Sequence, residues 1–141
     1  MDSIERFKDN PSGIITEENT KQAWLPKDSY QDLGKWQSWD EVQQYIGLMN
    51  RVYAGGLNGW RLPTKDEALS LYVIDLSHKD WAGEEIHIHP FFVEKCSYYM
   101  WTSEVNDQGQ VLHISLRDGS TEYIDKSERE LQAARLTLIQ P

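Results

Sequence analysis

The sequence predicts an α+β fold, because short strand patterns, two amphipathic helices, a long irregular loop and an antiparallel meander follow one another. The chain has 141 residues, and no repeat, linker or low-complexity tract divides it. We therefore expect a single domain over residues 1–141, with the two helices packed on short antiparallel strands. Hydrophobic residues make up 39% of the chain, which is enough for a packed core and speaks against disorder.

Two short strands are expected near the start of the chain. Residues 13–16 and 22–25 are mostly apolar and lie on either side of a polar turn at residues 17–20. The next residues, 26–35, are polar and show no helical repeat, so we expect a loop there.

Two capping boxes predict where the helices begin. Ser38 precedes Glu41 by three residues, and Thr64 precedes Glu67 by the same spacing. In this arrangement the hydroxyl and the carboxylate each accept a hydrogen bond from a backbone N–H that the helix leaves unpaired. Apolar residues recur at helical intervals after Ser38, which predicts an amphipathic helix that ends at a pair of glycines. The second helix is expected to run to about residue 72.

The second half of the chain divides into a long loop and a β-rich end. Residues 75–97 have no clear period, and an irregular stretch of this length is more often a functional loop than a connector. Asp118-Gly119 predicts a tight hairpin, because glycine accepts a positive φ. The strand patterns of this half lie at residues 98–103, 111–116, 121–124 and 134–139.

The most specific string in the sequence surrounds Arg61. Trp60 and Leu62 are expected to pack in the core as a short strand, and Pro63 sets a bend before the second helix. An arginine between two buried residues needs a carboxylate or backbone carbonyl groups, because an unpaired buried charge is costly. We interpret the string as architectural, and ligand binding by Arg61 is the alternative.

Several strings follow one another in an order that one protein family shares. They lie at residues 6–7, 13–16, 23–24, 39–42, 59–71, 99–103 and 116–119. In this order the chain resembles the Lcl C-terminal-like domain family, which is named after the end of a Legionella collagen-like protein. The residues that carry the structural signature of the resemblance are Trp60, Arg61, Pro63, Thr64, Glu67, Trp101, Asp118 and Gly119.

The resemblance implies a C-type-lectin-like fold. The Arg-Leu-Pro-Thr-x-x-Glu string is also similar to one in formylglycine-generating enzymes, which have this fold. Their activity is not implied, since it uses a pair of cysteines and this chain has only Cys96. Family members often carry cysteines where Ile46 and Leu136 stand, and the loss of both fits a protein outside oxidising compartments. We therefore expect a cytoplasmic protein, and an exported parent protein stays open.

The charge balance limits the classes of ligand. Lysine and arginine number 14 against 23 aspartates and glutamates, for a formal net charge of −9. Nucleic acids and sulfated polysaccharides bind basic surfaces, so neither is expected as a partner. No apolar run reaches the roughly 18 residues of a membrane span, so we expect no membrane partner.

Five residues of the long loop and the strands after it are candidates for ligand binding. They are Trp81, His87, His89, Tyr98 and Arg117. Trp81 leads this group, because aromatic rings stack on sugar rings and anchor protein partners.

His87 and His89 also suggest a metal site. Side chains two residues apart on an extended segment point the same way, so both imidazoles can meet one zinc ion. Such a site needs a third or fourth ligand, from among Glu84, Glu85, His78 and His113. The alternative is a solvent-facing strand edge with two incidental histidines, and on balance we expect no metal and no cofactor.

Two further side chains are assigned to structural positions. His113 lies opposite Leu112 and Ile114 in its strand and is expected at the surface. Cys96 is expected to be buried rather than nucleophilic, since free cysteines are among the most buried residues.

These observations favour a non-enzymatic recognition module that binds a protein or a neutral glycan. A metal-dependent hydrolase built on His87 and His89 is the rival of a different class. A third possibility is a subunit of a homo-oligomer whose aromatic patch is buried against copies of itself. The sequence leaves the ligand and the oligomeric state open.

Overall fold

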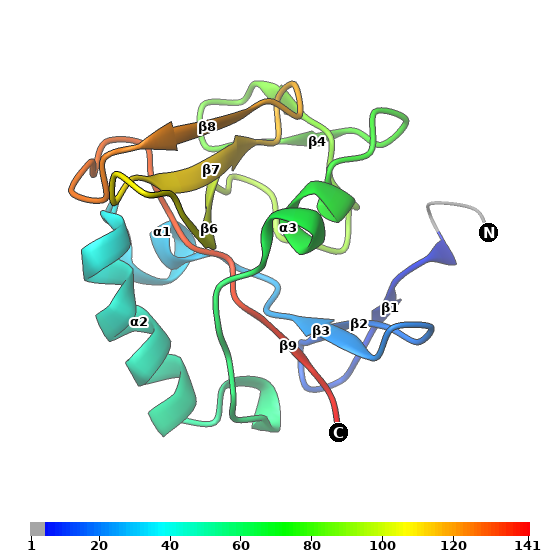
Figure 1. Ribbon diagram of the computed structural model, residues 1–141. Coiled ribbons are helices and arrows are strands. Elements are labelled where there is room, and N and C mark those ends of the chain that lie inside the picture. Colours follow the sequence, from blue (N-terminus) through cyan, green and yellow to red (C-terminus); the bar gives the residue numbers. More distant parts are fainter. Residues whose placement is uncertain (1–4) are drawn as a thin grey trace.

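The computed structural model describes residues 5–141, and these form a mixed α+β fold (Figure 1). The helices are α1 (Ser29–Leu33), α2 (Trp39–Arg51), α3 (Lys65–Leu71) and the 3₁₀ helix η2 (Ala54–Gly56). The strands are β1 (Lys8–Asp9), β2 (Ile15–Glu17), β3 (Gln22–Trp24), β4 (His78–Lys79), β5 (Glu85–Ile86), β6 (Tyr99–Val105), β7 (Val111–Ser115), β8 (Thr121–Ile124) and β9 (Thr137–Ile139).

The strands form three small sheets, and every pair within them is antiparallel. One sheet has the order β1-β2-β3-β9 and another has the order β6-β7-β8, while β4 and β5 pair alone. The helix α3 lies between the two larger sheets in Figure 1, and α2 runs along one side of the molecule. The last strand therefore completes the sheet that the first strands begin.

The two long helices begin where the capping boxes predict. Ser38 caps α2 and exchanges hydrogen bonds with Glu41, and Thr64 caps α3 in the same way with Glu67. Predicted and observed strands also agree closely at β2, β3, β6, β7 and β8. The sequence prediction of an α+β fold is thus confirmed.

The structure corrects two local expectations. The segment expected as a loop at residues 26–35 contains α1, which Asp28 caps in a reciprocal pair of hydrogen bonds with Gln31. The expected strand at residues 60–62 is reduced to one bridge, in which Arg61 and Thr137 exchange both backbone hydrogen bonds at 3.0 and 2.9 Å. A five-residue helix is too short to show a hydrophobic period, so the cap was its only sequence signal.

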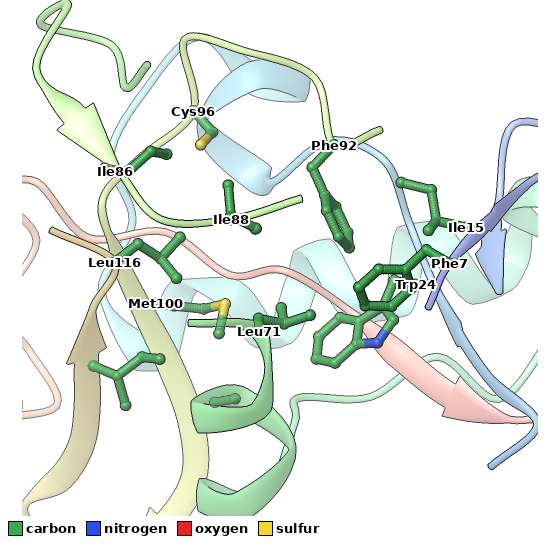
Figure 2. Close-up of a cluster of buried hydrophobic side chains, with 12 residues drawn as sticks. Phe7, Ile15, Trp24, Leu71, Ile86, Ile88, Phe92, Cys96, Met100 and Leu116 are labelled. Carbon is green, nitrogen blue, oxygen red and sulfur yellow. The ribbon is translucent and has the colours of Figure 1, made fainter. Parts of the chain in front are cut away.

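The sheet β6-β7-β8 lies between two apolar clusters. Met100 and Ile114 belong to the cluster in Figure 2, together with Phe92 and Cys96. Trp101 and Val111 belong to the second cluster, which packs under α2. Both faces of the central strand β7 are therefore covered, and all five of its residues are buried.

This double coverage corrects the prediction for His113. The side chain was expected at the surface but is only 4% exposed. Its Nδ1 lies 2.9 Å from Gln132 Oε1, and its ring stacks on Tyr99. The prediction was wrong because it assumed that only one face of the strand meets the core.

The long loop at residues 75–97 is irregular apart from the two-residue strands β4 and β5, as expected. Its apolar side chains Ile86, Ile88 and Phe92 are nevertheless buried in the first cluster (Figure 2). The loop thus contributes side chains to the core although its backbone is irregular. Only part of it is exposed to solvent. Within residues 5–141, no helix has the length and apolar character needed to cross a membrane.

Candidate aromatic binding surface

The ring of Trp36 lies in contact with two other aromatic side chains, Tyr30 and Trp81. Tyr30 of α1 stacks on Trp36 with ring centroids 3.9 Å apart and planes 11° from parallel. Trp81, which follows β4, contacts Trp36 at 5.3 Å and 75° in an edge-to-face arrangement. Trp81 remains 40% exposed. We call these three residues the aromatic platform. Trp36 lies at its centre and contacts both other rings.

Asp80 fixes the turn that carries Trp81. Its carboxylate is fully buried, and Oδ1 accepts hydrogen bonds from the backbone N–H groups of Ala82 and Glu84 at 2.9 and 3.0 Å. Oδ2 accepts a hydrogen bond from Arg117 Nε at 2.9 Å, and Arg117 Nη2 lies 2.8 Å from the same oxygen in an ion pair. A buried carboxylate held by three hydrogen bonds and an ion pair leaves little freedom to the turn, so the backbone of Trp81 is rigidly placed.

Asp28 connects α1 to the same loop. Its Oδ1 caps α1, and its Oδ2 accepts a hydrogen bond from the backbone N–H of Ser97 at 2.8 Å. The carbonyl of Cys96, one residue earlier, accepts from the N–H of Trp81 at 2.8 Å. Burial raises the pKa of the Asp28 carboxyl above its ordinary value, and the nearby Arg135 opposes this rise. Asp28 thus links the segment of Tyr30 to that of Trp81.

A groove of about 630 Å³ adjoins the platform and is lined by Tyr30, Gly34, Lys35, Trp36, Glu41 and Arg129. Among these lining residues, Arg129 donates two hydrogen bonds to the Glu41 carboxylate, at 2.8 and 3.0 Å. These bonds, with the backbone bond from Ser38, lower the pKa of Glu41 to about 2. The groove therefore offers aromatic rings and planar charged groups side by side.

Tyr98 and Arg117, two of the predicted ligand-binding residues, contact each other. The guanidinium carbon of Arg117 lies 3.7 Å from the centre of the Tyr98 ring, while the same guanidinium pairs with Asp80. The guanidinium therefore takes part in a cation–π contact and an ion pair at once. The structure thus places Arg117 against Asp80, in the turn that carries Trp81, and its side chain is 35% exposed.

His87 and His89 meet different neighbours. The Nδ1 atom of His87 lies 2.8 Å from the carbonyl oxygen of Leu76, and its ring contacts Tyr72. His89 is buried, and its Nδ1 accepts a hydrogen bond from the N–H of Phe91 at 3.1 Å. Within residues 5–141, no three side chains of the His, Cys, Asp or Glu type converge on a point where a metal ion could bind.

Cys96 is buried in the first apolar cluster (Figure 2). Burial raises the pKa of its thiol to about 11, so the thiolate that nucleophilic chemistry needs is scarce at neutral pH. The expectation of a buried, packing cysteine is confirmed.

The signature residues around Arg61 form hydrogen bonds with one another and with neighbouring segments of the chain. Arg61 donates to both Glu67 oxygens, at 2.7 and 2.9 Å, and Glu67 also caps α3 through Thr64. The Trp60 indole N–H donates to the carbonyl of Ala54, and the Pro63 carbonyl accepts from the N–H of Ser103.

Trp101, Asp118 and Gly119 also make contacts within the fold. Trp101 is fully buried, and its indole N–H donates to the carbonyl of Gln37 at 3.1 Å. Asp118 bonds to Ser120, and Gly119 has a φ of +77° in the turn between β7 and β8. This turn is wider than the expected tight hairpin, because Gly119 N–H bonds back to the carbonyl of Ser115.

Sequence reasoning missed Tyr30, Trp36, Asp28 and Asp80. Asp28 and Gln31 show capping-box spacing, and Asp80 precedes Gly83 in a turn-like string, so both aspartates had a local signal. The contact of Trp36 with Trp81 had none, because 45 residues separate the two rings.

Comparison with known proteins agrees with the resemblance drawn from the sequence. The family model described as the Lcl C-terminal domain matches residues 13–135, most of the chain. No curated protein and no solved structure matches the chain significantly. The matched region includes the platform, the groove and the signature around Arg61. The chain therefore belongs to the Lcl C-terminal domain family.

Proposed function

We propose that the chain is a non-enzymatic recognition module, and that its aromatic platform binds a protein or a neutral glycan. The observation that carries the proposal is the environment of Trp81, which is exposed yet held by Trp36 and by the buried Asp80 turn. A large aromatic ring that is already fixed before binding loses little conformational entropy when a ligand covers it. Exposed and rigid aromatic rings are typical of binding hot spots.

The groove beside the platform supports the same proposal. Glu41 and Arg129, which both line it, bind each other, so their charges are balanced where a ligand would lie. Their remaining lone pairs and N–H groups suit hydroxyl or amide groups of a neutral ligand. The net charge of −9 disfavours a polyanion.

The proposal extends to the architecture that the family resemblance implies, a C-type-lectin-like fold. The pairing of β3 with β9 supports it, since the beginning and the end of the domain join in one sheet. In this arrangement the irregular segment between α3 and β6 presents Trp81 on a rigid base.

The first test uses neutral oligosaccharides. Titration with cellohexaose, maltohexaose and chitohexaose, followed by calorimetry, is expected to reveal a ligand whose affinity falls roughly tenfold or more in Trp81→Ala. The matched control is Phe91→Ala, because Phe91 is 41% exposed against 40% for Trp81. Both variants are expected to keep the native circular dichroism spectrum.

The second test addresses a protein ligand. Quantitative capture with the native chain, Trp81→Ala and Phe91→Ala should identify a partner that only Trp81→Ala loses, and the partner is then purified and titrated. If Trp81→Ala binds every oligosaccharide and every purified partner as the native chain does, the platform is not the binding surface. An unfolded Trp81→Ala variant would show that Trp81 is a core residue, which contradicts the proposal in the same way.

A further inference from the structure

The strand β8 forms an open edge of the β6-β7-β8 sheet. The N–H of Ser115 donates to the carbonyl of Ser120, which sets the alternation of the ladder with β7. In an antiparallel edge strand every second residue directs its N–H and C=O away from the neighbouring strand. Counting from Ser120, these residues are Thr121 and Tyr123, and no hydrogen bond within residues 5–141 reaches the backbone of either.

This edge lacks three of the features with which proteins protect an open strand, namely a proline, a lysine and a bulge. The strand Thr121–Ile124 contains no proline and no lysine, and its pairing with β7 has no bulge. Thr121, Glu122 and Tyr123 are exposed. The outward N–H and C=O groups are therefore available to a further strand.

Carboxylates surround the edge. Asp118 precedes β8, Glu122 lies within it and Asp125 follows it, while Lys126 is the only lysine or arginine among residues 118–126. Glu104 of β6, on the other side of β7, accepts a hydrogen bond from the Tyr123 hydroxyl at 3.4 Å. A strand added at this edge therefore meets negative charge along its length.

We propose that the β8 edge binds an extended, basic peptide segment of a partner protein, which adds to the sheet as a further antiparallel strand. The backbone of Thr121 and Tyr123 supplies hydrogen bonds to any strand, and the carboxylates select lysine and arginine side chains. A second copy of this chain fits less well, because antiparallel pairing of two β8 strands would place acidic side chains opposite each other. The site uses none of the residues of the aromatic platform.

The test is a titration of the whole chain, labelled with ¹⁵N, with a blocked heptapeptide that alternates lysine with threonine and valine. The amide signals of Thr121 and Tyr123 are expected to shift and to exchange more slowly with water. Tyr123→Pro removes the outward N–H without removing a hydrogen bond to β7, and is expected to weaken binding roughly tenfold. Tyr123→Ala keeps that N–H and is the matched control. If Tyr123→Pro fails to fold, Thr121→Pro removes the other outward N–H.

A second set of experiments tests whether the carboxylates select basic peptides. The same peptide with glutamate in place of lysine should not bind, and Glu122→Lys should weaken binding of the lysine peptide. Equal binding by Tyr123→Pro and Tyr123→Ala would overturn the proposal. Failure of the lysine peptide to bind would overturn it as well. The carboxylates would then serve only to keep other strands from pairing with the edge. A dimer in light scattering that Tyr123→Pro dissociates would assign the edge to a second copy instead.

Discussion

Glu67 is held by four hydrogen bonds that connect three parts of the chain. Its two oxygens accept from the Arg61 guanidinium, from the N–H of Thr64 and from the Gln22 side chain. These donors, and Arg61 above all, lower the pKa of Glu67 to about 2. One carboxylate thus joins β3, the signature segment and the start of α3.

This pKa predicts how stability depends on pH. A carboxylate with a lowered pKa in the folded state stabilises the fold above its ordinary pKa, and this contribution is lost as the pH falls from about 4.5 to about 2. Because the Arg61 side chain is 42% exposed, we expect water and salt to screen the interaction to about 1–2 kcal/mol. Urea unfolding should therefore show Glu67→Gln less stable than the native chain at pH 7. At pH 2 the two should approach each other, and a constant difference would contradict the assignment.

Residues close in sequence were predictable, and residues brought together by the fold were not. The bond of Thr64 with Glu67 spans three positions and follows from local capping chemistry. The pair of Asp80 with Arg117 spans 37 positions, and no pattern in the sequence relates them. Arg117 was therefore expected to contact a ligand, while the structure places it against a buried carboxylate.

The connection after α2 depends on two consecutive glycines with positive φ. Gly55 has a φ of +64° and Gly56 a φ of +83°. A β-carbon at Gly55 would overlap the Cγ2 atom of Ile14, whereas one at Gly56 would meet nothing within 4 Å. The backbone therefore needs glycine at both positions, but only Gly55 also needs the space.

The two glycines give a matched comparison. Gly56→Ala is expected to lower the free energy of unfolding by about 1–2 kcal/mol, the cost of a left-handed backbone for alanine. Gly55→Ala adds the overlap with Ile14, for a total of about 2–4 kcal/mol. Urea denaturation of both variants measures the difference. Equal losses would mean that the chain relieves the overlap by a small shift.

Among the secondary-structure elements, those with a capping box or a hydrophobic repeat were predictable from the sequence. The helices α2 and α3 have capping boxes, and α2 also has a helical repeat, so their starts were predicted to the residue. The irregular loop was predicted, but the burial of its apolar side chains was not. Ile88 and Phe92 are buried because they pack into the first apolar cluster, and no alternation of apolar and polar residues in the sequence indicates this. The aromatic platform could not be predicted for the same reason, since Trp36 and Trp81 lie outside the helices and strands.

For the whole molecule, we expect stability to be independent of bound metal. His87 and His89 are engaged by the protein itself, and residues 5–141 contain no convergent set of three metal-ligating side chains. The melting temperature should be the same with and without EDTA, and elemental analysis should find no stoichiometric transition metal. A melt lowered by EDTA, with metal released by His87→Ala, would favour the hydrolase instead.

The pairing of β3 with β9 also governs the order in which the domain can be completed during synthesis. The Thr137 hydroxyl bonds to the carbonyl of Ala23, 114 residues earlier. At translation rates of about 5–20 residues per second, the ribosome needs about 6 to 23 s to make the chain between these two residues. Throughout that time β3 has an unpaired edge and an incomplete core beside it. The position of β9 at the end of the domain therefore sets the earliest moment at which this sheet can be completed.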